Sequence, residues 1–512
     1  MRLWPPLRPF LHRPDAVPAR ARRGVLAVLA PALLLAACGG GGDTAAPVRV
    51  VATSGPQAEE TLDAATGVGL TQVDARARII PGLAQSWRVS NDGSFVVLRL
   101  RAALGPGGRP LIAEDVVRAL QTARQSASRG DLRALLAGIA EVRAPLPEVV
   151  EIRLSTPQPE LLELLALPEL AIQPHRAVRR RIPAMPGPMR RVAGTAKDVV
   201  ELEVNPDFFA PSSVPARRIA LQTFPPDAAL ARFTRGEADV VLGGLLAGNA
   251  GARVVARRDA LRLELARATL FIAINQARAP LDDARVRTAL SMAVDRDQLG
   301  RELWGSPDAA PLFGLTPPGL AHFQPPEPPA WAALPLAARR AAARRLLLEA
   351  GHGPLDAPVR LSLATGDSPE EARLAGLLAA DWGTIGVETV VARRSAGGHA
   401  RALAAGTHEL AIMTRESPID SPLPFLLPLM CRANPQGVCN GPADDLVRQS
   451  WKAPTLAARM DALAAAERMW IEDGAVVPLA QPLRWTLVRP DIAGVEPNPS
   501  GIHPLRLIHR RD

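Results

Sequence analysis

The residues able to do chemistry in this chain of 512 residues do not form an arrangement typical of catalysis. GxSxG, Walker A and GxGxxG motifs are absent from strand–helix junctions. Ser368 follows Gly366 and Asp367, but Pro369 and an expected helix start indicate a turn and a helix cap. The sequence therefore predicts no enzyme, no cofactor and no metal site built from several side chains, although a metal carried by a small chelator stays open. The histidines are scattered and form no close ligand pair: His12, His175, His322, His352, His399, His408, His503 and His509.

The net charge of +9 is concentrated at the start of the chain. Residues 1–37 contain six arginines and one acid, so the rest of the chain carries a net charge of only +4. Nucleic-acid binding requires a clustered basic face beside base-reading residues, and we predict no nucleic-acid partner. The hydrophobic fraction of 47% is ordinary for a globular protein, and the length corresponds to one large domain or two to three ordinary ones.

The first 37 residues have the layout of a secretory signal peptide. Arg22 and Arg23 precede an apolar run, Val25–Ala36, that is too short to span a membrane. The run leads through Ala37 to Cys38, and four glycines follow. This arrangement resembles the lipobox of bacterial lipoproteins. The resemblance implies lipidation of Cys38, for example with palmitate, a flexible linker over residues 38–47, and a periplasmic or cell-envelope protein attached to the membrane by its lipid anchor. A plain signal peptide with an incidental cysteine is the alternative.

The two remaining cysteines, Cys431 and Cys439, lie close together in the sequence. In an exported chain, such a pair predicts a disulfide. A zinc site is the weaker interpretation, because no histidine lies nearby at ligand spacing and tetrahedral zinc needs more ligands.

Strand and helix patterns alternate along the chain, which predicts an α/β fold. Phe95–Leu100 alternates as a strand does, and Asn91-Asp92-Gly93 before it indicates a hairpin turn. Pro335 and Gly351 delimit an arginine-rich helix. Further strands are expected at Val48–Ala52, Val149–Leu154, Val199–Val204, Ile219–Leu221, Ala238–Leu242, Leu270–Asn275, Leu361–Ala364, Val387–Val391 and Val476–Leu479, and helices from Ala113, from Asp282, over Glu370–Trp382 and over Leu456–Met469.

The order of these segments resembles the family 5 solute-binding proteins of bacterial ABC importers, the dipeptide-, oligopeptide- and nickel-binding group. The resemblance covers about residues 48 to 495. PLDDARVRTALSMAVDR is its most specific segment, and the cysteine loop is most similar to the dipeptide-binding branch. The other segments are IIPGLAQSWRVSNDGSFVVLRLR, PLIAEDVVRAL, VNPDFF, FTRGEADVV, LLLEAGH, AADWGTIGVETVV, PADDL and VVPLA.

The resemblance implies a two-lobed periplasmic-binding-protein fold of class II, of the large cluster C type, with an extra N-terminal subdomain. Lobe one is expected to comprise residues 43–268 plus 482–512, and lobe two residues 269–481, with chain crossings near Ala268–Phe271 and Pro478–Arg484. A ligand that contacts both lobes would stabilise their closure. The implied function is a monomeric protein that captures a peptide-like or other small polar solute and delivers it to an ABC transporter permease.

The segment expected to hold a peptide's ammonium group departs from the family's pattern. Peptide-binding members carry an acid there, in G-W-x-x-D followed by D-P. Here Pro418 stands at the position of the acid and Arg415 at that of the tryptophan, with Glu416 and Asp420 nearby. Either the ligand is not a free dipeptide, or Asp420 and Arg415 supply the charges, Arg415 by bidentate bonding to a carboxylate. An exposed loop arginine is the alternative for Arg415.

The remaining ligand-binding candidates come from other loops. Thr365 stands where the dipeptide-type carboxylate clamp has an arginine. Thr66 offers a hydroxyl and Gly67 a close backbone approach in the lobe-one loop where the family meets its ligand, although both residues are equally typical of a turn. Trp304 and Trp485 either line the cleft or belong to the core.

Two other functions stay open. An exported hydrolase of a peptide or ester would use a cleft carboxylate such as Asp420, but the absence of a nucleophile–base motif favours a binding protein. The third possibility is a signalling or chaperone role without transport.

Overall fold

The computed structural model describes residues 46–104, 109–126, 130–172, 187–193, 198–255, 259–306, 308–353, 358–432, 434 and 437–511. The expected signal peptide, Cys38 and most of the expected linker lie outside these ranges. Within the described ranges, no helix is long and apolar enough to cross a membrane.

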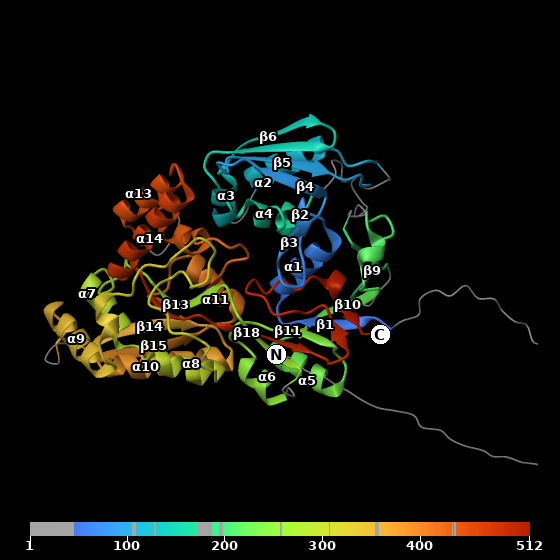
Figure 1. Cartoon of the computed structure of the whole chain (residues 1–512). Helices are drawn as coiled ribbons and strands as arrows, with labels where there is room; N and C mark the ends of the chain where they lie inside the picture. The colour runs from blue at the N-terminus through green and yellow to red at the C-terminus, as the bar shows by residue number, and fades with distance from the viewer. Residues whose placement is uncertain are drawn as a thin grey trace, which may run out of the picture. The chain divides into compact units, whose positions relative to one another are not determined.

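The largest sheet has seven strands in the order β12-β18-β11-β1-β10-β9-β8. Its central strand β1 is parallel to β10 and β11, and the outer pairs are antiparallel. Helix α1 lies on one side of this sheet and α5 and α6 on the other (Figure 1). The bounds are β1 Val48–Ala52, β8 Met189–Arg191, β9 Val200–Val204, β10 Arg218–Thr223, β11 Val240–Leu242, β12 Leu261–Leu265, β18 Leu483–Val488, α1 Gly55–Thr66, α5 Pro226–Arg235 and α6 Asn249–Val255.

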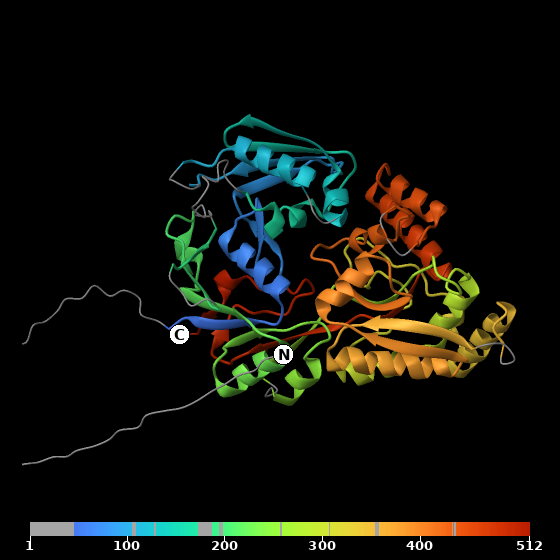
Figure 2. The same ribbon diagram turned by 180° about the vertical axis from the view of Figure 1, so that it is seen from behind.

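A second sheet has five strands in the order β15-β14-β16-β13-β17. Its strand β13 is buried along its whole length, as its continuous apolar sequence predicts. Helices α8, α9 and α10 run along one side of this sheet, and α11, α13 and α14 lie on the other side (Figure 2). The bounds are β13 Ala268–Ile274, β14 Val359–Thr365, β15 Val387–Arg393, β16 Leu410–Glu416, β17 Val476–Ala480, α7 Ala284–Ala293, α8 Arg296–Trp304, α9 Leu336–Glu349, α10 Pro369–Gly383, α11 Ala396–Ala404, α12 Leu423–Leu426, α13 Gly441–Ser450 and α14 Leu456–Glu472.

A third, antiparallel sheet of four strands, β4-β5-β7-β6, forms the additional N-terminal subdomain with α2 and α3 (Figure 1). The hairpin between β4 and β5 turns at the predicted Asn91-Asp92-Gly93, where Gly93 has a φ of 68° that suits glycine. The bounds are β4 Ala84–Val89, β5 Phe95–Leu100, β6 Ile139–Leu146, β7 Val149–Leu154, α2 Ala113–Ser126, α3 Gly130–Leu136 and α4 Leu161–Leu164. Two short antiparallel pairs lie outside these sheets: β2 Thr71–Val73 pairs with β3 Ile79–Pro81, and β19 Ile492–Ala493 pairs with β20 His509–Arg510.

The chain passes twice between the seven-stranded and the five-stranded sheet. The first passage, Ala266-Arg267, joins β12 to β13, and the second, Gln481-Pro482, joins β17 to β18. The expected crossing at Ala268–Phe271 is therefore the start of β13, and Pro478–Arg484 contains the second passage. We call the body around the seven-stranded sheet, with its subdomain, lobe one, and the body around the five-stranded sheet lobe two. The fold is a two-lobed α/β fold, as predicted.

Two local predictions from the sequence are also confirmed. Ser368 is the N-cap of α10, and its hydroxyl accepts a hydrogen bond from the Glu371 amide at 3.1 Å. Cys431 and Cys439 are joined by a disulfide.

Candidate binding site

A cavity of about 660 Å³ lies between the lobes. Most of its wall comes from lobe one: from Thr53 and α1, from residues 163–171, and from the loop over residues 242–247. Thr414, Glu416 and Pro418 from β16 and the following turn supply the side of lobe two. The passage residue Arg267 completes the wall together with Arg484, which lies just beyond the second passage, and with residues 500–504.

Helix α1 presents one face to the cavity and packs the other into lobe one. Ser54 caps the helix, and Ala58, Leu62 and Ala65 form its buried stripe at helical spacing. On the opposite face, Gln57 lines the cavity, as do Glu60, Thr61 and Ala64. The Gln57 amide group also donates to the Gly243 carbonyl at 3.0 Å, which fixes the loop over residues 242–247 against the helix.

Two fully buried tryptophans support this loop from behind the cavity wall. The Trp304 indole donates to the Leu245 carbonyl at 2.9 Å, and the Trp485 indole donates to the Ala247 carbonyl at 3.0 Å. Neither tryptophan lines the cavity. The structure therefore places Trp304 and Trp485 in the core, which is one of the two interpretations drawn from the sequence. Both residues also hold a loop of the cavity wall in place.

The charged side chains at the meeting of the lobes are largely paired with one another. Arg484 donates to the Glu416 carboxylate. Arg267 lies between two further carboxylates, with its guanidinium nitrogens 3.5 Å from Glu163 and 3.8 Å from Asp420. The Asp420 backbone amide also donates to Glu163 at 2.5 Å. This cluster neutralises most of the charge that each lobe brings to the interface.

The Glu416 carboxylate is held in an unusual environment. Its side chain is 36% exposed and lines the cavity between the lobes. Burial raises the pKa of this carboxyl above its ordinary value, and the neighbouring Arg484 opposes that rise. Burial likewise raises the pKa of Glu163, against the effect of Arg267.

Of the five ligand-binding candidates from the sequence, only Gly67 lies in the cavity wall. The Thr66 hydroxyl donates within its own helix, to the Leu62 carbonyl at 3.0 Å. Thr365 is completely buried at the end of β14. Arg415 lies on β16 between the wall residues Thr414 and Glu416, so strand alternation points its side chain to the other face.

Asp420, the fifth candidate, lies just outside the wall. Its carboxylate accepts a hydrogen bond from the Ala321 amide at 2.8 Å, in addition to its contact with Arg267. The structure therefore brings together a different set of polar residues from the one expected: Gln57, Glu163, Arg267, Glu416 and Arg484. The sequence contains one signal for Glu416. Residues Thr414, Arg415 and Glu416 are consecutive, so a strand that ends there places Thr414 and Glu416 on one face and Arg415 on the other.

Two lobes joined by two chain passages, with a cavity between them lined from both sides, define a two-lobed ligand-binding protein. The profile of the bacterial extracellular solute-binding proteins, family 5 (middle region), matches residues 78–435. The chain belongs to this family.

Individual relatives are similar over most of their length. "Di/tripeptide-binding protein 2" of Pseudomonas aeruginosa is 25% identical over 463 residues, which cover 83% of this chain and 85% of the relative. Among solved structures, the murein tripeptide-binding protein MppA of Escherichia coli matches with a TM-score of 0.79 and 21% identity, over 91% of this chain and 99% of its own. Haemophilus influenzae OppA in complex with RPPGFSPFR matches with a TM-score of 0.77 and 19% identity, over 91% and 99%.

Proposed function

We propose that this protein captures a peptide-like or other small polar solute in the cavity between its lobes and delivers it to the permease of an ABC transporter. The observation that carries the proposal is the cavity itself. Its volume of about 660 Å³ is typical of sites that enclose small molecules, and its wall combines apolar surface with a few fixed polar groups. The family and the peptide-binding relatives favour this function over an exported hydrolase.

We further propose the setting in which the protein works. Residues 1–37 direct export, Cys38 carries the lipid, and residues 38–47 link the anchor to the folded body, which faces the periplasm as a monomer. The body around the seven-stranded sheet moves as lobe one and the body around the five-stranded sheet as lobe two, with the hinge at Ala266-Arg267 and Gln481-Pro482. Mass spectrometry of the protein isolated from its own membranes tests the anchor, because lipidation at Cys38 adds acyl mass and removes residues 1–37.

The function is tested by identifying what the cavity holds. Native mass spectrometry of protein purified from its source should show a bound mass that is released unchanged on denaturation. Calorimetry with a library of di-, tri- and tetrapeptides should then give saturable binding for some members. Cleavage of the bound peptide would support the hydrolase instead, and the absence of any bound mass or binding would contradict both.

Within this function, we propose that Glu416 and not Asp420 reads a ligand's ammonium group. The Glu416 carboxylate faces the cavity, whereas the Asp420 carboxylate is bonded to the Ala321 amide outside the wall. An ammonium group enclosed without a counter-charge would lose several kcal/mol of hydration, about the cost estimated for a buried ion. Glu416 supplies that counter-charge, and Gly67 gives the ligand close access to the backbone.

Replacing Glu416 by glutamine is expected to weaken binding of a library peptide about tenfold or more, near 1.4 kcal/mol. Glutamine keeps an oxygen that accepts from Arg484 and removes only the charge. Calorimetry should show the loss for the free peptide and little loss for its N-acetylated form. Asp420→Asn in the same assay tests the other acid, and a larger loss for that variant would reverse the assignment.

Binding of the same peptide should weaken as the pH is lowered. Because burial raises the pKa of Glu416 and of Glu163, these carboxyls lose their charge at a higher pH than ordinary glutamates do. The affinity for an ammonium group is therefore highest at a pH above the raised pKa values, where both carboxyls are charged, and it declines as the pH falls through these values. Calorimetry from neutral to mildly acidic pH should show a shallower decline for Glu416→Gln, and identical profiles would contradict the role of Glu416.

A further inference from the structure

The basic side chains of the cavity wall are all engaged by other parts of the protein. Arg267 and Arg484 belong to the charged cluster between the lobes, where each has at least one carboxylate partner. Arg506 is almost completely buried and donates to a backbone carbonyl at 2.7 Å. His503 is buried as well, with its ring 3.4 Å from the Glu264 carboxylate. Within the described part of the chain, the wall therefore offers an anionic ligand group no basic side chain that lacks a partner.

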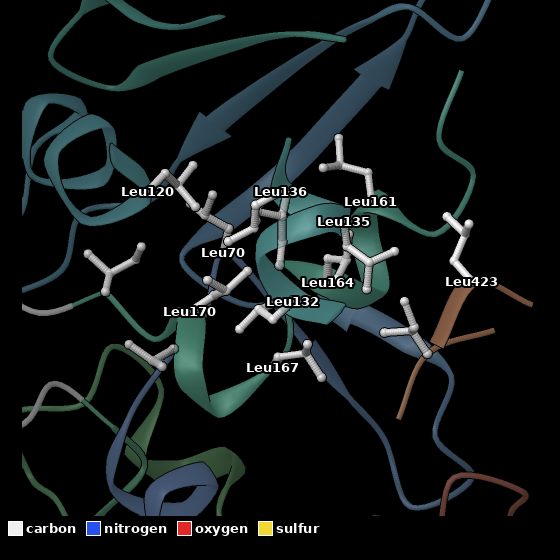
Figure 3. Packing of buried hydrophobic residues seen from close by; sticks show 14 of the residues in the cluster. Leu70, Leu120, Leu132, Leu135, Leu136, Leu161, Leu164, Leu167, Leu170 and Leu423 are labelled. Atoms are coloured by element: carbon white, nitrogen blue, oxygen red, sulfur yellow. The ribbon is translucent and has the colours of Figure 1, made fainter. Parts of the chain in front are cut away.

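The pairing of Arg267 is maintained by packing behind the wall. Its partner Glu163 belongs to α4, whose Leu161 and Leu164 are buried. Figure 3 shows both leucines among other packed leucines. Because these leucines anchor α4 in the core, the Glu163 carboxylate stays at the cavity wall beside Arg267. A ligand would have to break this arrangement to gain the guanidinium for itself.

Asp63 is a wall carboxylate without such a partner. It lies on α1 beside the buried stripe that anchors this helix, and its exposed side chain lines the cavity. Within the described residues, its carboxylate has neither an ion pair nor a hydrogen bond. Partial burial raises the pKa of this carboxyl, Arg191 on β8 opposes the rise, and Glu59 and Glu169 add to it. The negative charge of Asp63 is therefore only partly compensated by the protein.

These two observations give the cavity a preference of sign. A cationic group placed near Asp63 gains an attraction that the protein itself does not supply, whereas an anionic group there is repelled. The engaged basic side chains could compensate an anionic group only by giving up their own partners, which would leave carboxylates unpaired. The cavity is thus suited to a ligand that carries positive charge beyond a single ammonium group.

We propose that the cavity selects ligands with a second cationic group, such as the side chain of a lysine or arginine in a peptide, and that Asp63 binds this group. The proposal rests on the proposed function and names its substrate class: Glu416 binds the ammonium group of a peptide, and Asp63 binds its basic side chain. Acidic peptides are excluded because their side chain finds no available cation and is repelled by Asp63. A linear diamine shares the chemistry of two ammonium groups, so the experiment must separate it from a peptide.

Calorimetry with alanine tripeptides that carry a single lysine at each position in turn tests this selectivity. Each peptide is compared with the same peptide in which norleucine replaces lysine, because norleucine keeps the four side-chain carbons and lacks the ammonium group. At least one lysine peptide should bind about fivefold or more tightly than its norleucine counterpart, the size of one ion pair at a partly exposed site. The matching glutamate peptide should bind more weakly than either.

Asp63→Asn should abolish the preference for lysine and leave the affinity for the norleucine peptide unchanged. Glu59→Gln is the matched control, since it removes the same charge from an exposed residue of α1 that is not part of the cavity wall. This variant should keep the preference. Circular dichroism checks that both variants are folded. In the same assay, 1,5-diaminopentane identifies the source: binding as tight as that of the lysine peptide assigns the subsite to a free amine, and weaker binding assigns it to a peptide.

The proposal is overturned if lysine and norleucine peptides bind the wild type equally. It is also overturned if the preference for lysine persists in folded Asp63→Asn. In both cases peptides still bind, so the proposed function stands without this selectivity. If neither a peptide nor the diamine binds, the proposed function fails as well, and the two failures are therefore distinguishable.

Discussion

Gly243→Ala is expected to weaken ligand binding at least tenfold and to lower the free energy of unfolding by about 1–3 kcal/mol, the usual cost of overpacking. A Cβ atom at this position would lie 2.2 Å from the ring of Trp485 and 2.2 Å from its backbone oxygen. Trp485 is fully buried and its indole is bonded to Ala247, so it has no room to move. The loop over residues 242–247 must shift instead, and this loop is cavity wall.

The neighbouring glycine provides a matched control. Gly244 also lines the cavity, but a Cβ atom there would meet nothing nearer than the Ala247 oxygen at 3.8 Å. Calorimetry with a library peptide and urea unfolding should therefore separate Gly244→Ala, which remains close to wild type, from Gly243→Ala. Equal effects of the two substitutions would show that the contact with Trp485 does not control the loop.

Arg296→Met is expected to lower the free energy of unfolding by about 3 kcal/mol, because it leaves several buried acceptors without donors. The fully buried guanidinium donates to the carbonyls of Leu312 and Pro478, each at 2.9 Å, and to the carbonyl and hydroxyl of Ser291. Burial lowers the pKa of Arg296 to about 9. The arginine thus replaces water as the donor to three chain segments: the end of α7 at Ser291, the segment at Leu312, and strand β17 at Pro478.

Urea unfolding monitored by circular dichroism measures this effect. Arg345→Met on α9 is the control, because Arg345 is exposed and the same chemical change there removes no buried donor. Equal stability of Arg296→Met and Arg345→Met would mean that the acceptors around Arg296 find other donors when it is removed.

The strands and helices that local sequence features define were predicted closely. Val48–Ala52, Phe95–Leu100 and Val149–Leu154 are strands with the expected bounds. Helix α9 begins after Pro335, as expected. Hydrophobic alternation, caps and turn residues act over a few positions, so the amino-acid sequence displays them directly.

Of the ligand-binding candidates predicted from the sequence, only Gly67 lies in the cavity wall, and the missed strands explain part of this. No strand was expected at Leu410–Glu416 or at Leu483–Val488, yet these strands carry Glu416 and Arg484. The alternation that separates Glu416 from Arg415 depends on strand β16. The residue type and chain position of Asp420 favour it as a ligand group, but they do not reveal its bond to the Ala321 amide.

The sequence by itself determined the α/β class, many of the strands and helices, the disulfide and the family of this protein. Only the tertiary structure decided which charges face the cavity and which are already paired. Glu416 pairs with Arg484 across 68 positions of sequence, and Glu163 lies against Arg267 across 104. Such pairs are set by how elements far apart in the sequence pack against each other, and no local periodicity encodes that packing.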